Sequence, residues 1–174
     1  MENKVTASQI GFRYGLILGL IYIIYSMILQ FADMDIKTMQ AFGYLNYVIL
    51  IVAIVLAHKA FKTGGDGFMS LGQGIGSGTL LSVVSGAISG IFSFIYIKFV
   101  DDSMLTKIKD MQIEEMEKRG MDDAQIDQAM QVAGMFMSPI AIAIMSVIAM
   151  AFFGFILSLI ISLFTKKVNP SMEV

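Results

Sequence analysis

Residues 71–100 read LGQGIGSGTLLSVVSGAISGIFSFIYIKFV, thirty residues that are almost all apolar or small. Glycine or serine recurs in this stretch at every fourth position, as Gly74, Gly78, Ser82, Gly86 and Gly90. In water each interior glycine weakens a helix by about 1 kcal/mol relative to alanine. In a bilayer the backbone has no water to bond to, so a helix is forced. Its smooth face would let a neighbouring helix approach closely. The stretch therefore predicts the packing spine of an integral membrane protein.

The composition agrees with this prediction. Of 174 residues, 56% are hydrophobic and 15% charged, with a mean hydropathy of +0.75; soluble domains have roughly 45–50% apolar and about 25% charged residues. The apolar residues concentrate in four blocks, and a span needs about 20 residues. We therefore expect an all-α, four-helix membrane bundle forming a single transmembrane domain, residues 1–174. The expected spans are about 10–32, 41–57, 71–100 and 138–164.

Small residues also recur at helical spacing in the first and fourth spans, whereas the second span is bulky and β-branched. The first span repeats glycine at every fourth position, and the fourth carries a shorter file of glycine and serine. Such files allow close helix packing. The predicted packing residues outside the third span are Gly11, Gly15, Gly19, Gly154 and Ser158.

Residues 101–137 form the only sizeable polar segment, with nine acids and four bases. Gly120 is suited to end one helix, and Asp122 with Gln125 matches the capping box that begins another. We expect an acidic, amphipathic helical hairpin outside the membrane, between the third and fourth spans. Seven of the chain's 15 methionines fall here. They fit either packing within the hairpin or a groove for a partner or the membrane surface.

Few polar side chains lie near the span ends, and two of them have two interpretations each. Arg13 either anchors the first span at the headgroups or pairs with a lipid phosphate or a polar group of another helix. Asn46 either hydrogen-bonds a neighbouring helix or contacts a substrate. Gln73 and Lys98 are further candidates for polar or lipid contacts. His58, with two lysines after it, is expected to end the second span at a polar face.

Several function classes are disfavoured. A net charge of -2 argues against nucleic acid as a partner. No cysteine and a single histidine leave no disulfide, thiol catalysis or multi-histidine metal site. The glycine-rich loop at 63–67 lacks the Gly-Lys-Ser/Thr ending of a phosphate-binding loop. Asp101 and Asp102 are better suited to capping a helix than to catalysis. We therefore expect no catalytic, cofactor or metal site, and no enzyme.

Basic residues beside the spans favour both termini in the cytoplasm and the hairpin outside, because orientation follows lysine and arginine rather than acids. The margin between the two sides is modest, but every short cytoplasmic segment carries basic residues. The cytoplasmic set is Lys4, Arg13, Lys59, Lys62, Lys166 and Lys167; the opposite set is Lys37, Lys98, Lys107, Lys109, Lys118 and Arg119.

The order of these landmarks resembles a family of small four-span proteins of unknown function from Bacteroidota-type bacteria. The residues that carry the resemblance are Tyr14-Gly15 with Gly19, Ala60-Phe61-Lys62, Leu71-Gly72-Gln73-Gly74, Tyr96-Ile97-Lys98-Phe99 and Ser138-Pro139. The resemblance covers nearly the whole chain. It implies an inner-membrane location and the four-span plan, and it implies no activity.

Two functions remain open from the sequence. The first is a non-catalytic membrane subunit or scaffold that uses its glycine faces to dock on itself or on another membrane protein. The second is a small carrier or channel for a lipid-like or neutral amphipathic solute, formed by one chain or an oligomer. In both, the partners are the lipid bilayer and other membrane proteins rather than nucleic acid, and no cofactor is expected.

Overall fold

The computed structural model describes residues 5–32 and 36–167, and the expected all-α fold is confirmed over them. The helices are α1 (Ala7–Phe31), α2 (Ile36–Gly43), α3 (Leu45–Gly64), α4 (Leu71–Phe99), α5 (Ser103–Lys118), α6 (Asp123–Phe136) and α7 (Pro139–Thr165). No strand occurs in these residues, which hold one isolated antiparallel bridge between Met69 and Lys167. Four helical stretches are long and apolar enough to cross a membrane, namely Ala7–Phe31, Ala41–Gly64, Leu71–Phe99 and Pro139–Thr165. These stretches indicate a multi-pass membrane protein.

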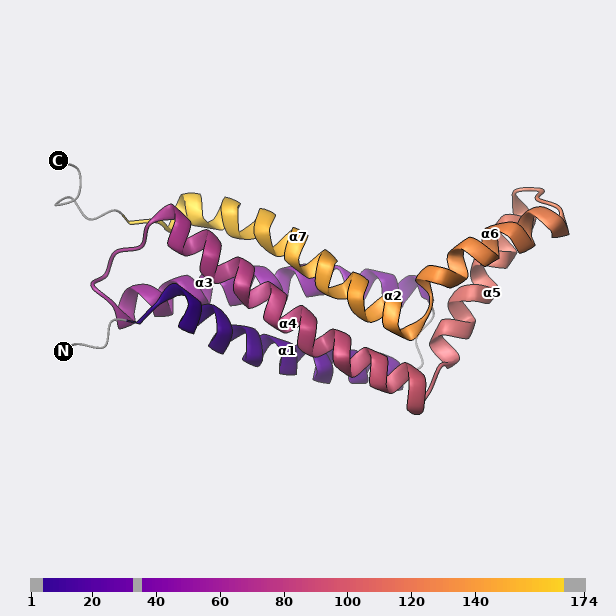
Figure 1. Ribbon diagram of the computed structural model, residues 1–174, viewed down its shortest axis with the longest axis horizontal. Coiled ribbons are helices and arrows are strands. Elements are labelled where there is room, and N and C mark those ends of the chain that lie inside the picture. Colours follow the sequence, from indigo (N-terminus) through magenta and orange to yellow (C-terminus); the bar gives the residue numbers. More distant parts are fainter. Residues whose placement is uncertain (1–4, 33–35, 168–174) are drawn as a thin grey trace. The chain divides into compact units, whose positions relative to one another are not determined.

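The described residues form two compact units. Unit 1 comprises the residues up to Ser89 and those from Val147 onward, and unit 2 comprises Gly90–Ser146. Unit 1 therefore holds α1, α2, α3 and most of α4 and α7 (Figure 1).

Within unit 1, α4 packs closely against α1 on one side and α7 on the other. A Cβ atom added at Gly15 of α1 would lie 2.7 Å from Val84 Cβ of α4. One added at Gly86 of α4 would lie 2.8 Å from Met150 Cβ of α7. Real Cβ atoms do not approach so closely, so glycine is required wherever these backbones meet. α4 is thus the helix that its two neighbours share.

Helix α3 completes the core of unit 1 with one apolar face. Leu50, Ile54, Ala57 and Phe61 are buried and recur at helical intervals. They belong to one cluster with buried side chains of α1 and α4. The Tyr22 hydroxyl of α1 donates a hydrogen bond to the Asn46 carbonyl oxygen of α3 at 2.9 Å. This bond joins the two helices near the start of α3.

The second span begins at Ala41, as the sequence predicts, but it extends beyond the expected end at residue 57 to Gly64. Residues 33–40 lie between the first and second expected spans; residues 33–35 are outside the described part, and residues 36–40 form the start of α2 (Ile36–Gly43). Helix α3 does not end at His58 but continues to Gly64. The expected polar helix end was wrong because His58 is fully buried and its ring nitrogens have hydrogen-bond partners on other helices.

In unit 2, α5 and α6 contact each other and are joined by a short turn. Gly120 has a φ of 78°, a left-handed conformation that glycine adopts without strain. Asp122 accepts a hydrogen bond from the Gln125 amide at 2.8 Å, and the Gln125 side chain accepts one from the Asp122 amide at 3.1 Å. The sequence prediction of a helix break at Gly120 and a capping box at Asp122 is confirmed.

Candidate functional site

His58 is a fully buried polar side chain at a junction of α3, α4 and α7. Its Nε2 lies 2.9 Å from the Gly74 carbonyl oxygen of α4, and its Nδ1 lies 2.8 Å from the Thr165 hydroxyl of α7. A buried polar group is costly unless it is hydrogen-bonded. His58 therefore meets this requirement by joining three helices.

The hydrogen bonds of His58 constrain where the ring protons lie. A carbonyl oxygen only accepts, so Nε2 must carry a hydrogen and donate it to Gly74. In the neutral ring Nδ1 is then an acceptor, and the Thr165 hydroxyl donates to it. The same hydroxyl also lies 2.9 Å from the Ile161 carbonyl oxygen. Its single hydrogen cannot serve both acceptors, so protonating Nδ1 would turn the Thr165 hydroxyl toward Ile161.

Two further contacts hold the end of α7 beside this junction. The Lys62 ammonium group donates to the Thr165 carbonyl oxygen at 3.0 Å, placing a cation at a helix C-terminus where it is favourable. Met69 and Lys167 exchange backbone hydrogen bonds of 2.8 and 2.9 Å. These contacts hold the ends of α3, α4 and α7 together, and both ring nitrogens of His58 have hydrogen-bond partners.

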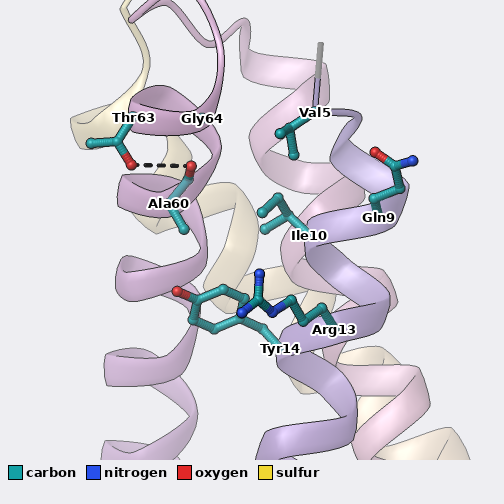
Figure 2. A pocket seen from close by; sticks show the side chains of 8 residues that line it. All are labelled: Val5, Gln9, Ile10, Arg13, Tyr14, Ala60, Thr63 and Gly64. Atoms are coloured by element: carbon teal, nitrogen blue, oxygen red, sulfur yellow. Dashed lines mark hydrogen bonds between the residues drawn. The ribbon is translucent and has the colours of Figure 1, made fainter. Parts of the chain in front are cut away.

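A pocket of about 430 Å³ lies between the N-terminal part of α1 and the C-terminal part of α3. Figure 2 shows the Arg13 and Tyr14 side chains reaching from α1 into the space between the two helices. Val5, Ile10 and Ala60 supply apolar lining. The pocket therefore combines a cation, a phenol and apolar walls, and it belongs entirely to unit 1.

The polar groups that line this pocket differ in their freedom. The Thr63 hydroxyl donates to backbone carbonyl oxygens of its own helix, at 3.1 and 3.2 Å. Gln9 Oε1 accepts the Thr6 amide at 3.0 Å, which leaves the Gln9 amide NH₂ group without a partner in residues 5–32 and 36–167. Arg13 is exposed and has no ion pair or hydrogen bond with the described residues. The groups left free are hydrogen-bond donors.

The glycines and serines expected from the sequence to pack lie at the contacts between helices. Gly11, Gly15 and Gly19 of α1 meet α4, where added Cβ atoms would lie 2.7 to 2.8 Å from its atoms. Gly74 meets Ser162 of α7. The remaining α4–α7 contacts pair Gly78 with Ser158, Ser82 with Gly154, Gly86 with Met150, and Gly90 with Ser146.

The other polar residues singled out in the sequence lie apart from one another. Asn46 is half-buried, and its backbone oxygen rather than its amide accepts from α1. Gln73 is exposed and caps the start of α4, because its Oε1 accepts the Ser70 amide at 2.8 Å. Lys98 is exposed, with its ammonium group 5.2 Å from the centre of the Phe94 ring. Of this group, Arg13 lines the pocket between α1 and α3.

Of the two acids considered as catalytic candidates, Asp101 has structural partners, whereas the Asp102 side chain makes no capping hydrogen bond at the start of α5. Asp101 accepts hydrogen bonds from the Ser103 amide at 2.8 Å and from the Ser103 hydroxyl at 3.0 Å, and these bonds hold the pKa of Asp101 below its ordinary value. The Lys118 ammonium group likewise lowers the pKa of Glu114. Among residues 5–32 and 36–167, no three His, Cys, Asp or Glu side chains gather as a metal site would require.

Sequence reasoning missed His58 as a buried junction. The available signal was its register, since Leu50, Ile54 and His58 follow one another at intervals of four residues on one helix face. The position of His58 in the helix therefore predicts burial beside Leu50 and Ile54, whereas its residue type suggested a polar helix end.

Comparison with known proteins places the chain in a family. Residues 13–167 match the model of a family described as "Protein of unknown function (DUF4199)". The chain belongs to this family. The match begins at the pocket residue Arg13 and ends at Lys167, which pairs with Met69, so it includes all four candidate spans almost completely. Searches of curated proteins and of solved structures gave no match.

Proposed function

We propose that this protein is a non-catalytic integral membrane subunit or scaffold. Glycine-rich helix packing builds its own bundle, because the small faces of α1, α4 and α7 lie against one another within the chain. A scaffold built in this way needs a different surface for its partner. The observation that carries the proposal is such a surface on α6, outside the candidate spans.

One face of α6 is apolar and exposed. Val132, Met135 and Phe136 are 58%, 71% and 61% exposed, and their spacing places them side by side on a helix. Ile126, on a different face of the same helix, is buried. Single exposed apolar residues are ordinary, whereas a group of them marks an interaction surface. Methionine suits such a surface because it is flexible and polarizable.

Site-specific photocrosslinking in native membranes tests the partner role. A photoreactive residue at Met135 should give a discrete cross-linked protein band, and native gels should show one higher-mass species. Asp127, exposed on another face of α6, provides the matched control and should give no such band. A strictly monomeric protein whose position 135 cross-links only lipid contradicts the subunit role.

The pocket favours a second function, a small carrier; of the two solute classes expected from the sequence, lipid-like and neutral amphipathic, its Arg13, unpaired in the described part of the chain, fits the lipid-like one. Its volume, about 430 Å³, lies in the range of small-molecule sites. Against a polar pathway through the bundle, the hydroxyls of Ser77, Ser82 and Ser85 all bond to carbonyl oxygens of their own helix. Reconstitution into liposomes distinguishes the two functions, because a carrier accelerates movement of labelled lipid or solute and a scaffold does not.

The proposed location is a bacterial inner membrane, with the start of α1 and the end of α7 on the cytoplasmic side. That end of unit 1 is basic: its charged residues in the described part are Arg13, Lys59, Lys62, Lys166 and Lys167 against one acid, Asp66. Lys4 lies outside the described residues. The chain has no cysteine, so single cysteines at Ser70 and Asp127 can be labelled from either side. Protection of Ser70→Cys and labelling of Asp127→Cys in intact cells supports this orientation, and the reverse overturns it.

A further inference from the structure

We propose that the pocket between α1 and α3 is a binding site for the phosphate group of a phospholipid, held by Arg13. The site does not depend on a partner at α6, so it stands or falls separately from the scaffold role.

The length of α1 sets the depth of Arg13. Its 25 residues span about 37 Å, which exceeds a hydrocarbon core of about 30 Å by some 3 to 4 Å at each end. Arg13 lies six residues beyond Ala7, so its Cα would sit about 5 Å inside the hydrocarbon boundary. Helical side chains lean toward the N-terminus, and a long arginine stem can raise its guanidinium to the headgroups. The charged group is therefore expected at the level of lipid phosphates.

The groups left free in the pocket are donors. Arg13 has no partner among the described residues, and its planar guanidinium matches the oxygens of a phosphate. The Gln9 NH₂ group is also unpaired within the described part, but Figure 2 shows the Gln9 side chain on the side of α1 away from α3, so it lies at the rim of the pocket. The Tyr14 hydroxyl has no hydrogen bond to the residues at 5–32 or 36–167, and Figure 2 shows the Tyr14 ring beside Arg13 with the hydroxyl on the side toward α3. The Arg13 cation, left unpaired by the described residues and set among other groups that can donate hydrogen bonds, favours an anionic ligand over a neutral one.

The surroundings favour a lipid as the source of the phosphate. Val5, Ile10 and Ala60 give the pocket an apolar lining that suits the glycerol and the first methylenes of an acyl chain. The five basic side chains at this end of unit 1, with one acid among the described residues, attract an anionic headgroup. Outside the pocket, exposed Phe12 and Leu16 continue along α1 toward the bilayer core. A tail leaving the pocket would therefore follow an apolar surface.

The test is lipid retention by the purified full-length protein, measured by native mass spectrometry after transfer from nanodiscs. The nanodiscs contain phosphatidylglycerol, or phosphatidylcholine, or phosphatidylcholine with diacylglycerol, which has the same tails and no phosphate. We expect retained phosphatidylglycerol and no retained diacylglycerol. Arg13→Gln should weaken phosphatidylglycerol binding at least about tenfold, because a charge-assisted hydrogen bond is lost. Arg13→Lys should keep only part of the binding, because the charge remains while the planar guanidinium that matches the phosphate oxygens is lost.

Two further variants separate the pocket from the general charge of this end. Lys59→Gln removes an exposed cation one residue before Ala60 on α3, outside the pocket lining, and should change binding less than threefold. Ala60→Leu fills the pocket without changing charge and should reduce binding as Arg13→Gln does. Equal loss in Lys59→Gln and Arg13→Gln, or wild-type binding in Arg13→Gln, overturns the proposal. Displacement of the lipid by millimolar inorganic phosphate would assign the site to a soluble phosphate and overturn the lipid source.

Discussion

Replacing Gly15 by alanine should loosen the contact between α1 and α4, whereas the same change at Gly76 should not. The added Cβ at Gly15 would lie 2.7 Å from Val84 Cβ and 2.8 Å from the Leu81 carbonyl oxygen. Neither atom can move by a rotamer change, because one is backbone and the other is fixed to it. At Gly76 nothing lies within 4 Å of the added atom. The two substitutions are therefore matched in chemistry and differ in their surroundings.

The magnitude follows from the difference between the two variants. Both gain helix propensity, worth up to about 1 kcal/mol in water, so this gain cancels in the comparison. What remains is overpacking at Gly15, which in protein cores costs about 1–3 kcal/mol. The α1 and α4 backbones must separate by about 1 Å to restore ordinary carbon contacts of about 3.5–4.0 Å. We expect Gly15→Ala to have a free energy of unfolding about 1–3 kcal/mol below that of Gly76→Ala.

Equilibrium unfolding in mixed micelles, followed by circular dichroism and by a tyrosine fluorescence signal, measures this difference. Both proteins should be studied at several concentrations, because a concentration-dependent midpoint would point to a contact between chains. If Gly15→Ala proves as stable as Gly76→Ala, the close approach of α1 to α4 does not exist. If its loss of stability grows with dilution, the face serves an oligomer instead of the protomer.

Further changes test other contacts. His58→Phe should lower the free energy of unfolding by about 1–3 kcal/mol, since the buried Gly74 carbonyl oxygen and the half-buried Thr165 hydroxyl each lose a hydrogen bond to the ring; unchanged stability in the same micelle assay would contradict the junction. Tyr22→Phe should cost about 0.5–1.5 kcal/mol in that assay through one lost hydrogen bond, and a larger loss would indicate another role. Asp122→Ala removes a cap worth about 0.5–2 kcal/mol and should speed amide exchange in α6 while leaving α5 unchanged. The pKa of Asp101 is lowered, so its stabilising bonds are complete above the ordinary value of 3.8 and are lost as pH falls through the lowered pKa. Ser103→Ala should move that pKa part of the way back toward 3.8 in an NMR titration, and no movement would exclude the hydroxyl as a cause.

The long helices could be predicted from sequence because their cause is local. An apolar run of about 20 residues can satisfy its backbone in a bilayer only as a helix, so the expected third span, 71–100, and α4 (Leu71–Phe99) nearly coincide. The break at Gly120 and the cap at Asp122 were equally local. These features depend on residues within one turn of each other, where residue type decides the conformation.

The errors arose where distant residues decide. A histidine followed by two lysines has the composition of a helix end, yet Gly74 and Thr165 supply acceptors and donors that allow His58 to be buried. Nothing near His58 in the sequence announces either partner. The pocket is a similar case, because Arg13 and Ala60 meet only after α1 and α3 have packed. The spacing of residues along the chain shows which side of a helix can be packed, but it does not show which other helix will pack there.

The sharing of α4 between two neighbours also sets an order of assembly. Its face toward α1 can be covered as soon as α4 is inserted, because α1 precedes it in the chain. Its face toward α7 must wait, since α7 ends roughly 65 residues later. At a synthesis rate of about 5–20 residues per second, that glycine and serine face stays bare for about 3–13 s. During this interval the membrane contains a smooth helix face with no partner, and α7 of a neighbouring nascent chain could occupy it. Crowded synthesis should therefore favour exchange of α7 between chains, an outcome that slow expression avoids.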